Sequence, residues 1–284
     1  MPTLTPGFSA SLAPVSGGHE VGPGAGGTET PSAGIGHLVN LLDPARCAFF
    51  FDVDGTLIDI AARPDAVVVP PELLADLSAL QTRADGALAL VSGRAVENLD
   101  HLFAPLRLSA SGIHGAQMRA QPGGEIVSSV APLPHDLRAT LALIAADLEG
   151  VMAEDKGASV AMHYRDAPEI GPVLEGMLHA LVGESHARLV VLPGRMVFEV
   201  KQAGHDKGMA VTRFMELAAY GGRTPVFIGD DVTDQAGFAS VCALGGIAIS
   251  VGRQFPGVHA VLPEPADVRS LIATLAEKPF ERRN

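Results

Sequence analysis

The sequence is poor in cysteine and in long apolar runs, and each shortage excludes a class of protein. Its two cysteines, Cys47 and Cys242, both lie beside apolar strand-like runs. A disulfide framework or a thiolate metal site is therefore not indicated, and buried reduced thiols are expected. No apolar run approaches the roughly 20 residues that a bilayer span requires. Because the N-terminus also has no basic region followed by an apolar one, the sequence predicts a cytoplasmic protein.

Positive charge is also scarce. Lysine and arginine number 20 against 32 aspartates and glutamates, which gives a formal net charge of −12. This balance argues against nucleic acid or an anionic membrane surface as a partner. An anionic small molecule is not excluded, but a metal ion and a few well-placed cations would have to attract it against the overall charge.

The chain of 284 residues has the length of roughly two domains. Residues 1–36 are rich in glycine, proline, serine and threonine, which predicts a flexible tail. Residues 37–112 and 205–284 alternate short apolar runs with amphipathic helical patterns. This alternation predicts an α/β core with a Rossmann-like parallel sheet and helices on both faces. Residues 113–204 are expected to form an inserted α+β cap domain.

The elements expected in the core follow from these patterns. Strands are predicted over residues 48–53, 87–91, 225–229 and 246–251, and helices over residues 71–82, 95–103, 209–219 and 266–276. In sheets of this kind ligands bind beyond the carboxyl ends of the strands. The residues that follow each strand are therefore the candidates for a site.

The cap segment has a different sequence pattern from the core, because its strands alternate apolar and polar residues. Val160, Met162 and Tyr164 share one face, whereas His163 and Arg165 share the other. The run over residues 195–201 repeats the pattern, with Met196, Phe198 and Val200 opposite Arg195, Glu199 and Lys201. Two helices, one carrying Leu137, Leu141, Ile144 and Leu148 and one over residues 172–181, are expected to cover the apolar face. The polar face then forms a lid over a site or an ordinary solvated surface.

The most informative motif follows the first core strand, where Asp52 and Asp54 flank Val53 and precede Gly55. Side chains at i and i+2 project from the same side of a strand, so the two carboxylates leave the sheet together. Such a pair can share a divalent cation, or one member can keep a proton for acid-base chemistry. A carboxylate can also attack phosphorus directly. The alternative is an Asp-rich turn that closes a strand.

Three further features lie at strand ends or helix starts of the core. Ser92 stands where a strand gives way to a helix and can bind a phosphate oxygen or cap the helix. Lys207 begins a helix, an electrostatic misfit that indicates an anionic partner. The run Gly229-Asp230-Asp231-Val232-Thr233-Asp234 adds an acidic loop, which with the first can complete a magnesium site. A calcium loop would need its acidic ligands within one loop.

Together, D-x-D-G-T-L, S-G-R, D-K-G and G-D-D-x-T-D occur in this order, and from about residue 47 onward the chain resembles the haloacid dehalogenase (HAD) superfamily of phosphohydrolases. The resemblance implies a HAD core in which Asp52 is the nucleophile and Asp54 the general acid and base. It implies Mg²⁺ held by the Asp52 carboxylate, the Asp54 carbonyl and Asp230. Further implied roles are phosphoryl binding by Ser92 and Lys207, and orientation of the lysine and metal waters by Asp231 and Asp234.

The cap carries a finer resemblance. E-x-K at Glu154 and Lys156, H-Y-R ending at Arg165, and the later Glu199 look like the trehalose-6-phosphate phosphatase family. The resemblance implies that Glu154, Lys156 and Glu199 bind sugar hydroxyls. It also implies that Arg94 and Arg165 lie near the phosphate or the lid closure. Gln235 departs from the family's usual glutamate, which puts a secondary contact in doubt.

The leading hypothesis is therefore a Mg²⁺-dependent phosphatase that hydrolyses trehalose 6-phosphate through an aspartyl-phosphate. A small-molecule sugar phosphate is the expected partner, and a functional link to a trehalose-6-phosphate synthase is a further expectation. The alternatives are a phosphatase for another sugar phosphate such as sucrose 6-phosphate, a phosphomutase, and a non-catalytic sugar-phosphate binding protein. His114 and His205, at the two crossings between core and cap, are interpreted as hinge residues.

Overall fold

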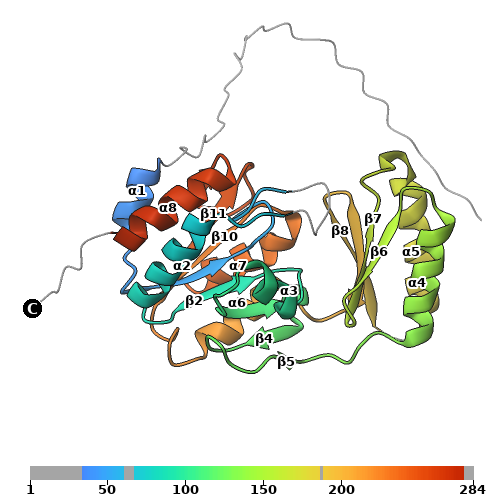
Figure 1. Ribbon diagram of the computed structural model, residues 1–284, viewed down its shortest axis with the longest axis horizontal. Coiled ribbons are helices and arrows are strands. Elements are labelled where there is room, and N and C mark those ends of the chain that lie inside the picture. The colour runs from blue at the N-terminus through green and yellow to red at the C-terminus, as the bar shows by residue number, and fades with distance from the viewer. Residues whose placement is uncertain (1–33, 61–66, 186–187, 278–284) are drawn as a thin grey trace, which may run out of the picture. The chain divides into compact units, whose positions relative to one another are not determined.

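The computed structural model describes residues 34–60, 67–185 and 188–277. They fall within one compact unit, residues 31–284. The predicted tail over residues 1–36 lies almost wholly outside the described residues. The described chain forms two sheets, one of eight strands and one of four (Figure 1). No helix within these ranges is long and apolar enough to cross a membrane.

The large sheet is mainly parallel, as the alternating pattern predicts. Its central strand β1 (Cys47–Phe51) is buried along all five residues, because both faces of the sheet are covered. Strands β4 and β5 extend one edge in antiparallel fashion. They lie within the span expected for the cap but pair with the large sheet. The strand order is β12 (Ala260–Leu262), β11 (Ile247–Val251), β10 (Thr224–Gly229), β1, β2 (Leu88–Val91), β3 (Ser109–Gly112), β4 (Gln117–Arg119) and β5 (Val127–Ser128).

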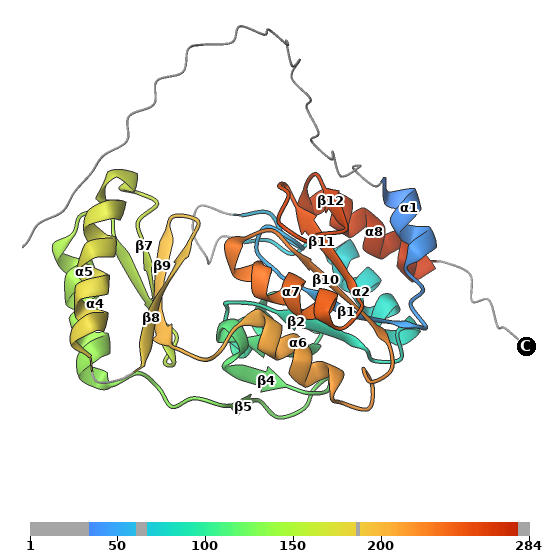
Figure 2. The same cartoon turned by 180° about the vertical axis from the view of Figure 1, so that it is seen from behind.

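Helices cover both faces of this sheet (Figures 1 and 2). On one face α1 (Ile35–Leu41), α2 (Pro71–Arg83) and α8 (Pro265–Glu277) pack together. On the other, α6 (Lys207–Met215) packs against α7 (Gln235–Ala243). Helix α3 (Val96–Leu102) follows β2. The predicted fold class, an α/β core with helices on both faces, is confirmed.

The predicted core elements agree with the structure to within two residues at each end, except for α6. This helix was expected over residues 209–219 but begins at Lys207 and ends at Met215. The chain then turns, because the Tyr220 ring packs into the core against Phe50 and Phe214. The Tyr220 hydroxyl donates to the Leu88 carbonyl oxygen, 3.0 Å away. The sequence reading did not anticipate α1, α7, β3, β4, β5 or β12.

The smaller sheet is antiparallel, in the order β6 (Met152–Asp155), β7 (Ser159–His163), β9 (Val197–Gln202), β8 (Leu189–Gly194). Helices α4 (His135–Asp147) and α5 (Gly171–Glu184) lie on one face of it (Figure 1). The predicted faces are confirmed, because Val160, Met162, Phe198 and Val200 form one apolar cluster with these helices. The cross-strand partners Ala161 and Glu199 share the opposite, polar face.

Two predictions, one in the smaller sheet and one on the cysteines, need correction. The strand expected from Arg195 begins at Val197, and Met196 is 39% exposed instead of facing the apolar cluster. Arg195 and Met196 form the two-residue connection between β8 and β9, and Met196 has a φ of 57°, so its backbone is turned away from the extended form of a strand. Both cysteines are free as expected, but only Cys47 is buried, and Cys242 is half-buried.

Candidate active site

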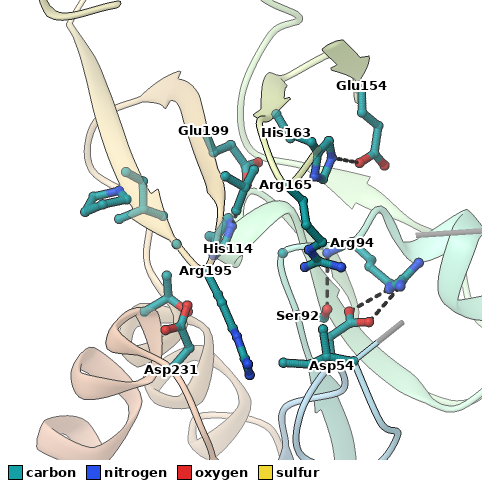
Figure 3. A pocket seen from close by; sticks show the side chains of 18 of the residues that line it. Asp54, Ser92, Arg94, His114, Glu154, His163, Arg165, Arg195, Glu199 and Asp231 are labelled. Atoms are coloured by element: carbon teal, nitrogen blue, oxygen red, sulfur yellow. Dashed lines mark hydrogen bonds and ion pairs between the residues drawn. The ribbon is translucent and has the colours of Figure 1, made fainter. Parts of the chain in front are cut away.

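The predicted core residues meet at one edge of the large sheet. Asp52 follows β1, Ser92 follows β2 and Asp230 follows β10, and β1 lies between the other two strands. Because these strands are parallel, their carboxyl ends bring the three side chains together. A cavity of about 280 Å³ opens there, lined by residues of both sheets (Figure 3).

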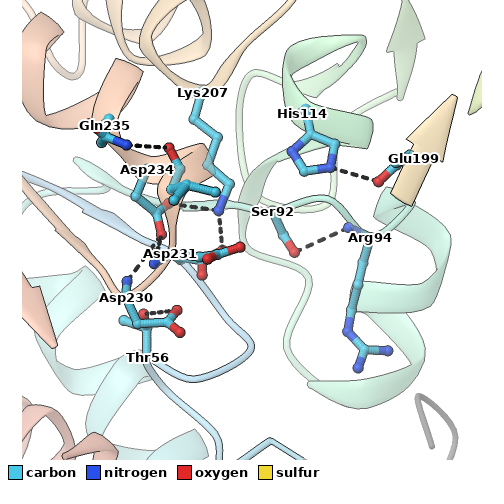
Figure 4. Close-up of polar contacts among 12 residues, drawn as sticks. Thr56, Ser92, Arg94, His114, Glu199, Lys207, Asp230, Asp231, Asp234 and Gln235 are labelled. Carbon is cyan, nitrogen blue, oxygen red and sulfur yellow. Dashed lines mark hydrogen bonds and ion pairs between the residues drawn. The ribbon is translucent and has the colours of Figure 1, made fainter. Parts of the chain in front are cut away.

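Lys207 links two of the acidic residues at the bottom of this site (Figure 4). Its Nζ lies 2.7 Å from Asp52 Oδ1 and 2.6 Å from Asp234 Oδ1, and all three side chains are buried. Burial alone would lower the pKa of Lys207, but Asp234 and Asp52 hold it well above its ordinary value. The lysine is therefore a permanent cation, able to stabilise an anion that approaches Asp52.

The acidic loop after β10 is organised around Asp234, which lies in the short helix η4 (Val232–Asp234). Its Oδ2 accepts the backbone N–H groups of Asp230 and Asp231 at 3.0 and 2.9 Å. Asp231 pairs with Arg253 Nη2 at 3.0 Å. Asp234 thus holds both the lysine and the loop, whereas Asp231 makes its ion pair with Arg253.

The carboxylates fit a divalent cation. One ligand oxygen from each of Asp52, Asp230 and Asp234 lies within 4.8 Å of the others. Burial, reinforced by the charge of Asp234, raises the pKa of Asp52 well above its ordinary value and that of Asp230 to about 6. The three carboxylates together carry more negative charge than the single ammonium of Lys207 can neutralise. Their oxygen atoms are hard ligands of the kind that Mg²⁺ and Ca²⁺ prefer. A side chain at position 55 would collide with the Asp230 carboxylate, so Gly55 leaves room for the site.

Asp54 makes a different contact. Arg94 Nε and Nη2 each lie 2.6 Å from one of its two carboxylate oxygens. This fork-shaped pairing holds both carboxylate oxygens of Asp54 in one orientation. The backbone N–H of Arg94 donates to Ser92 Oγ at 3.1 Å, which leaves the hydroxyl hydrogen of Ser92 for another acceptor. The guanidinium of Arg94, expected near a phosphate, thus lies on Asp54.

The smaller sheet contributes its polar face to the same cavity. Glu154 Oε2 lies 3.0 Å from His163 Nε2. Lys156 Nζ donates to the Gly93 carbonyl oxygen at 3.1 Å and lies 3.5 Å from Glu199. Arg165 lines the cavity as well (Figure 3). The structure therefore brings all four predicted cap residues to the site, while their roles stay predictions.

Sequence reasoning assigned no site role to three side chains that line this cavity, those of His114, His163 and Arg195. His114 is a buried partner of Glu199. The other residue interpreted as a hinge, His205, accepts from the ammonium of Lys201 through its carbonyl oxygen. Arg195 extends into the cavity from the turn between β8 and β9 (Figure 3). His163 pairs with Glu154. The alternating pattern placed His163 and Arg195 on the polar face, but nothing local marked His114.

Comparison with known proteins agrees with this geometry. A sequence model of the trehalose-phosphatase family matches residues 50–258. The chain is 40% identical over 232 residues to the probable trehalose-phosphate phosphatase of Sinorhizobium fredii (strain NBRC 101917 / NGR234), covering 81% of this chain and 87% of that protein. It is 41% identical over 209 residues to the trehalose-6-phosphate phosphatase of Escherichia coli (strain K12), covering 73% and 78%.

Solved structures share the fold. The C-terminal domain of C. albicans trehalose-6-phosphate phosphatase superposes with a TM-score of 0.75 at 23% identity, covering 87% of this chain and 97% of that one. The predicted fold is confirmed, since a phosphatase of the haloalkanoate (HAD) enzyme superfamily from Bacteroides thetaiotaomicron shares it with a TM-score of 0.51 at 13% identity. The match to the family model, over residues 50–258, includes the acidic loops, the lysine and the second sheet. The chain therefore belongs to the trehalose-phosphatase family.

Proposed function

We propose that this protein hydrolyses trehalose 6-phosphate to trehalose and inorganic phosphate through a phosphorylated Asp52. The observation that carries the proposal is the buried contact between Lys207 and Asp52, 2.7 Å long, at the base of a cavity whose opposite wall is a polar sheet face. A carboxylate held beside a permanent cation can approach an anionic phosphate, and the sheet face offers partners for sugar hydroxyls.

The reaction proceeds in two steps. Asp52 attacks phosphorus, the bond from phosphorus to the sugar oxygen breaks, and Asp54 gives a proton to the leaving alkoxide. Water then attacks the aspartyl-phosphate and Asp54 takes its proton, which releases phosphate and restores Asp52. Ser92 and Lys207 stabilise the phosphoryl oxygens in both steps. Because Arg94 holds both carboxylate oxygens of Asp54, one of these hydrogen bonds has to open before Asp54 can reach the leaving oxygen or the attacking water.

The proposed metal is Mg²⁺. Its ligands would be the carboxylates of Asp52 and Asp230 and the backbone carbonyl of Asp54. When bound, the ion neutralises charge so that a carboxylate can meet a phosphate dianion.

Recognition of the sugar is assigned to the segment over residues 113–204, which acts as a lid in this proposal. Glu154, Lys156 and Glu199 would bind hydroxyl groups, and Arg165 would lie near the phosphate. Closure of such a lid excludes water from the reacting atoms. The cytoplasmic location and a functional link to a synthase stay predictions from the sequence.

A substrate panel tests the proposed function. Phosphate release is measured with trehalose 6-phosphate, sucrose 6-phosphate and glucose 6-phosphate, with Mg²⁺ and after chelation. We expect a clear preference for trehalose 6-phosphate and loss of activity on chelation, whereas equal rates on the three substrates would contradict the specificity. Heavy-oxygen-labelled water should label the released phosphate, and phosphate transferred back to a sugar would indicate a mutase. Asp52→Asn is the matched inactive control.

A further inference from the structure

A buried hydrogen bond joins the two sheets beside the cavity. His114 lies in the short helix η2 (Ile113–Gly115) directly after β3 of the large sheet, and Glu199 lies in β9 of the smaller one. His114 Nε2 is 2.8 Å from Glu199 Oε2 (Figure 4), and the two side chains are only 9% and 8% exposed. The other oxygen of Glu199 accepts from Ser159 Oγ at 2.5 Å. Both carboxylate oxygens are thus held by protein groups.

Within the part of the chain that the structure describes, the imidazole of His114 makes its hydrogen bond to Glu199 and no other. Its Nδ1 is buried and has no hydrogen-bond partner among the described residues. Burial lowers the pKa of His114, so the ring is neutral near pH 7 and carries one N–H. Because a carboxylate only accepts, that hydrogen must lie on Nε2. Leaving Nδ1 unpaired costs free energy, which indicates that the hydrogen bond to Glu199 is the purpose of this side chain.

Lys156 and Gly93 connect the hydrogen bond between His114 and Glu199 to the end of β2, where Ser92 is proposed to bind phosphate. Lys156 Nζ lies between Glu199 and the Gly93 carbonyl oxygen, at 3.5 and 3.1 Å. A side chain at position 93 would collide with His114 Nε2, so Gly93 lets the imidazole pack against the backbone that follows Ser92. Glu199 and Lys156 are therefore placed relative to Ser92 by His114.

We infer that His114 is a positioning residue for sugar recognition: its hydrogen bond holds the Glu199 carboxylate and, through it, the Lys156 ammonium at a fixed place beside Ser92. The inference rests on the proposed function, in which these side chains contact the sugar. Ser159, His114 and Lys156 surround the two oxygens of Glu199, so they fix the direction in which this carboxylate meets the sugar.

Two substitutions separate this role from a structural one. His114 has a φ of 50°, in the left-handed region that asparagine tolerates better than glutamine. Glutamine, however, places an N–H near the position of the imidazole Nε2, whereas the shorter asparagine falls short of Glu199. If His114 only supports the turn, His114→Asn should be the milder change. If it holds Glu199, His114→Gln should be milder.

We expect His114→Asn to lower kcat/KM for trehalose 6-phosphate about tenfold, mainly by raising KM, because a hydrogen bond to a charged group is lost. His114→Gln should stay within about threefold of the native value. On p-nitrophenyl phosphate, which has no sugar, His114→Asn should cost less than about threefold. The exposed His101 on α3 supplies the control, since His101→Asn should change neither activity.

Several results would overturn the inference. They are equal activity of both His114 variants and the native protein, a milder effect of asparagine than of glutamine, or equal losses on both substrates. Failure of the proposed function is recognised separately, because the native protein would then not prefer trehalose 6-phosphate. Should His114→Asn not fold, nitrogen NMR of the native protein decides: a hydrogen on Nε2, in the neutral ring or in an imidazolium, supports the inference, and an Nδ1–H tautomer contradicts it.

Discussion

Asp230 is the residue whose charge couples the site to pH. Burial and the neighbouring charge of Asp234 raise its pKa to about 6, against an unfolded value of about 3.9. The folded state therefore binds a proton more readily than the unfolded chain. The resulting stabilisation is fully present below the unfolded pKa and is lost as the pH rises through about 6. Stabilisation by a bound cation has the opposite pH dependence and increases as the pH rises, because the cation binds the ionised carboxylate of Asp230.

Stabilisation by Mg²⁺ should consequently grow with pH. At about pH 7.5 and a concentration of 100 times Kd, we expect Mg²⁺ to add about 2.7 kcal/mol to the free energy of unfolding. At about pH 5 the effect should be clearly smaller, since Asp230 is then protonated. Thermal unfolding in Mg²⁺ and in chelator measures it. Asp230→Asn should abolish most of the stabilisation by Mg²⁺ at both pH values. A stabilisation by Mg²⁺ that does not depend on pH would contradict the assignment of Asp230 as a ligand.

At the scale of elements, α6 presents Lys207 to the site. A lysine in the first turn of a helix is unfavourable to the helix dipole, yet its side chain is 3% exposed and fixed between two carboxylates. The N-cap Asp206 offsets this cost, because its Oδ1 accepts the Met209 N–H at 2.8 Å. The negative charge of Asp206 is also favourable at this helix end.

Asp206→Ala should lower the free energy of unfolding by about 1 kcal/mol through loss of the cap. A chain of this size would then melt roughly 2–4 °C earlier. Because Lys207 is the next residue, we also expect a severalfold fall in kcat. Asp206→Asn is the matched control, since asparagine caps helices about as well as aspartate. Equal losses in both variants would show that charge, and not capping, is what α6 requires.

At the scale of the whole molecule, the described residues contain two main apolar clusters, one for each sheet. The large sheet packs with its helices around residues such as Phe50, Phe227 and Leu271. The small sheet packs with α4 and α5 around Leu141, Met162 and Leu178. The proposed phosphate contacts lie at the edge of the first sheet and the proposed sugar contacts on the second, so the two clusters should support different parts of the activity.

Leu178→Ala, in the small cluster, should cost about 2–5 kcal/mol through the cavity it creates. We expect activity on trehalose 6-phosphate to fall at temperatures where activity on p-nitrophenyl phosphate persists. Leu271→Ala, at an equally buried position in the large cluster, should lose both activities together. Parallel loss of both activities in Leu178→Ala would contradict this division of labour.

Much of the site could be predicted because its information is local. Asp52, Asp54 and Asp230 directly follow apolar strands, Ser92 follows another, and the carboxyl ends of parallel strands lie at one edge by the rules of the fold. The alternation in residues 159–201 likewise predicted which face of the second sheet is polar, since the side-chain period of a strand is two.

The pairing of side chains was decided by the tertiary structure alone. Arg94 lies on Asp54, Asp231 on Arg253, and His114 on Glu199, contacts that join positions 40, 22 and 85 residues apart. No periodicity records such pairs, because they depend on how two sheets and their loops pack. The sequence by itself thus determined the family, the fold class and which carboxylates meet at one edge of the sheet, whereas packing determined which partner each charged group meets.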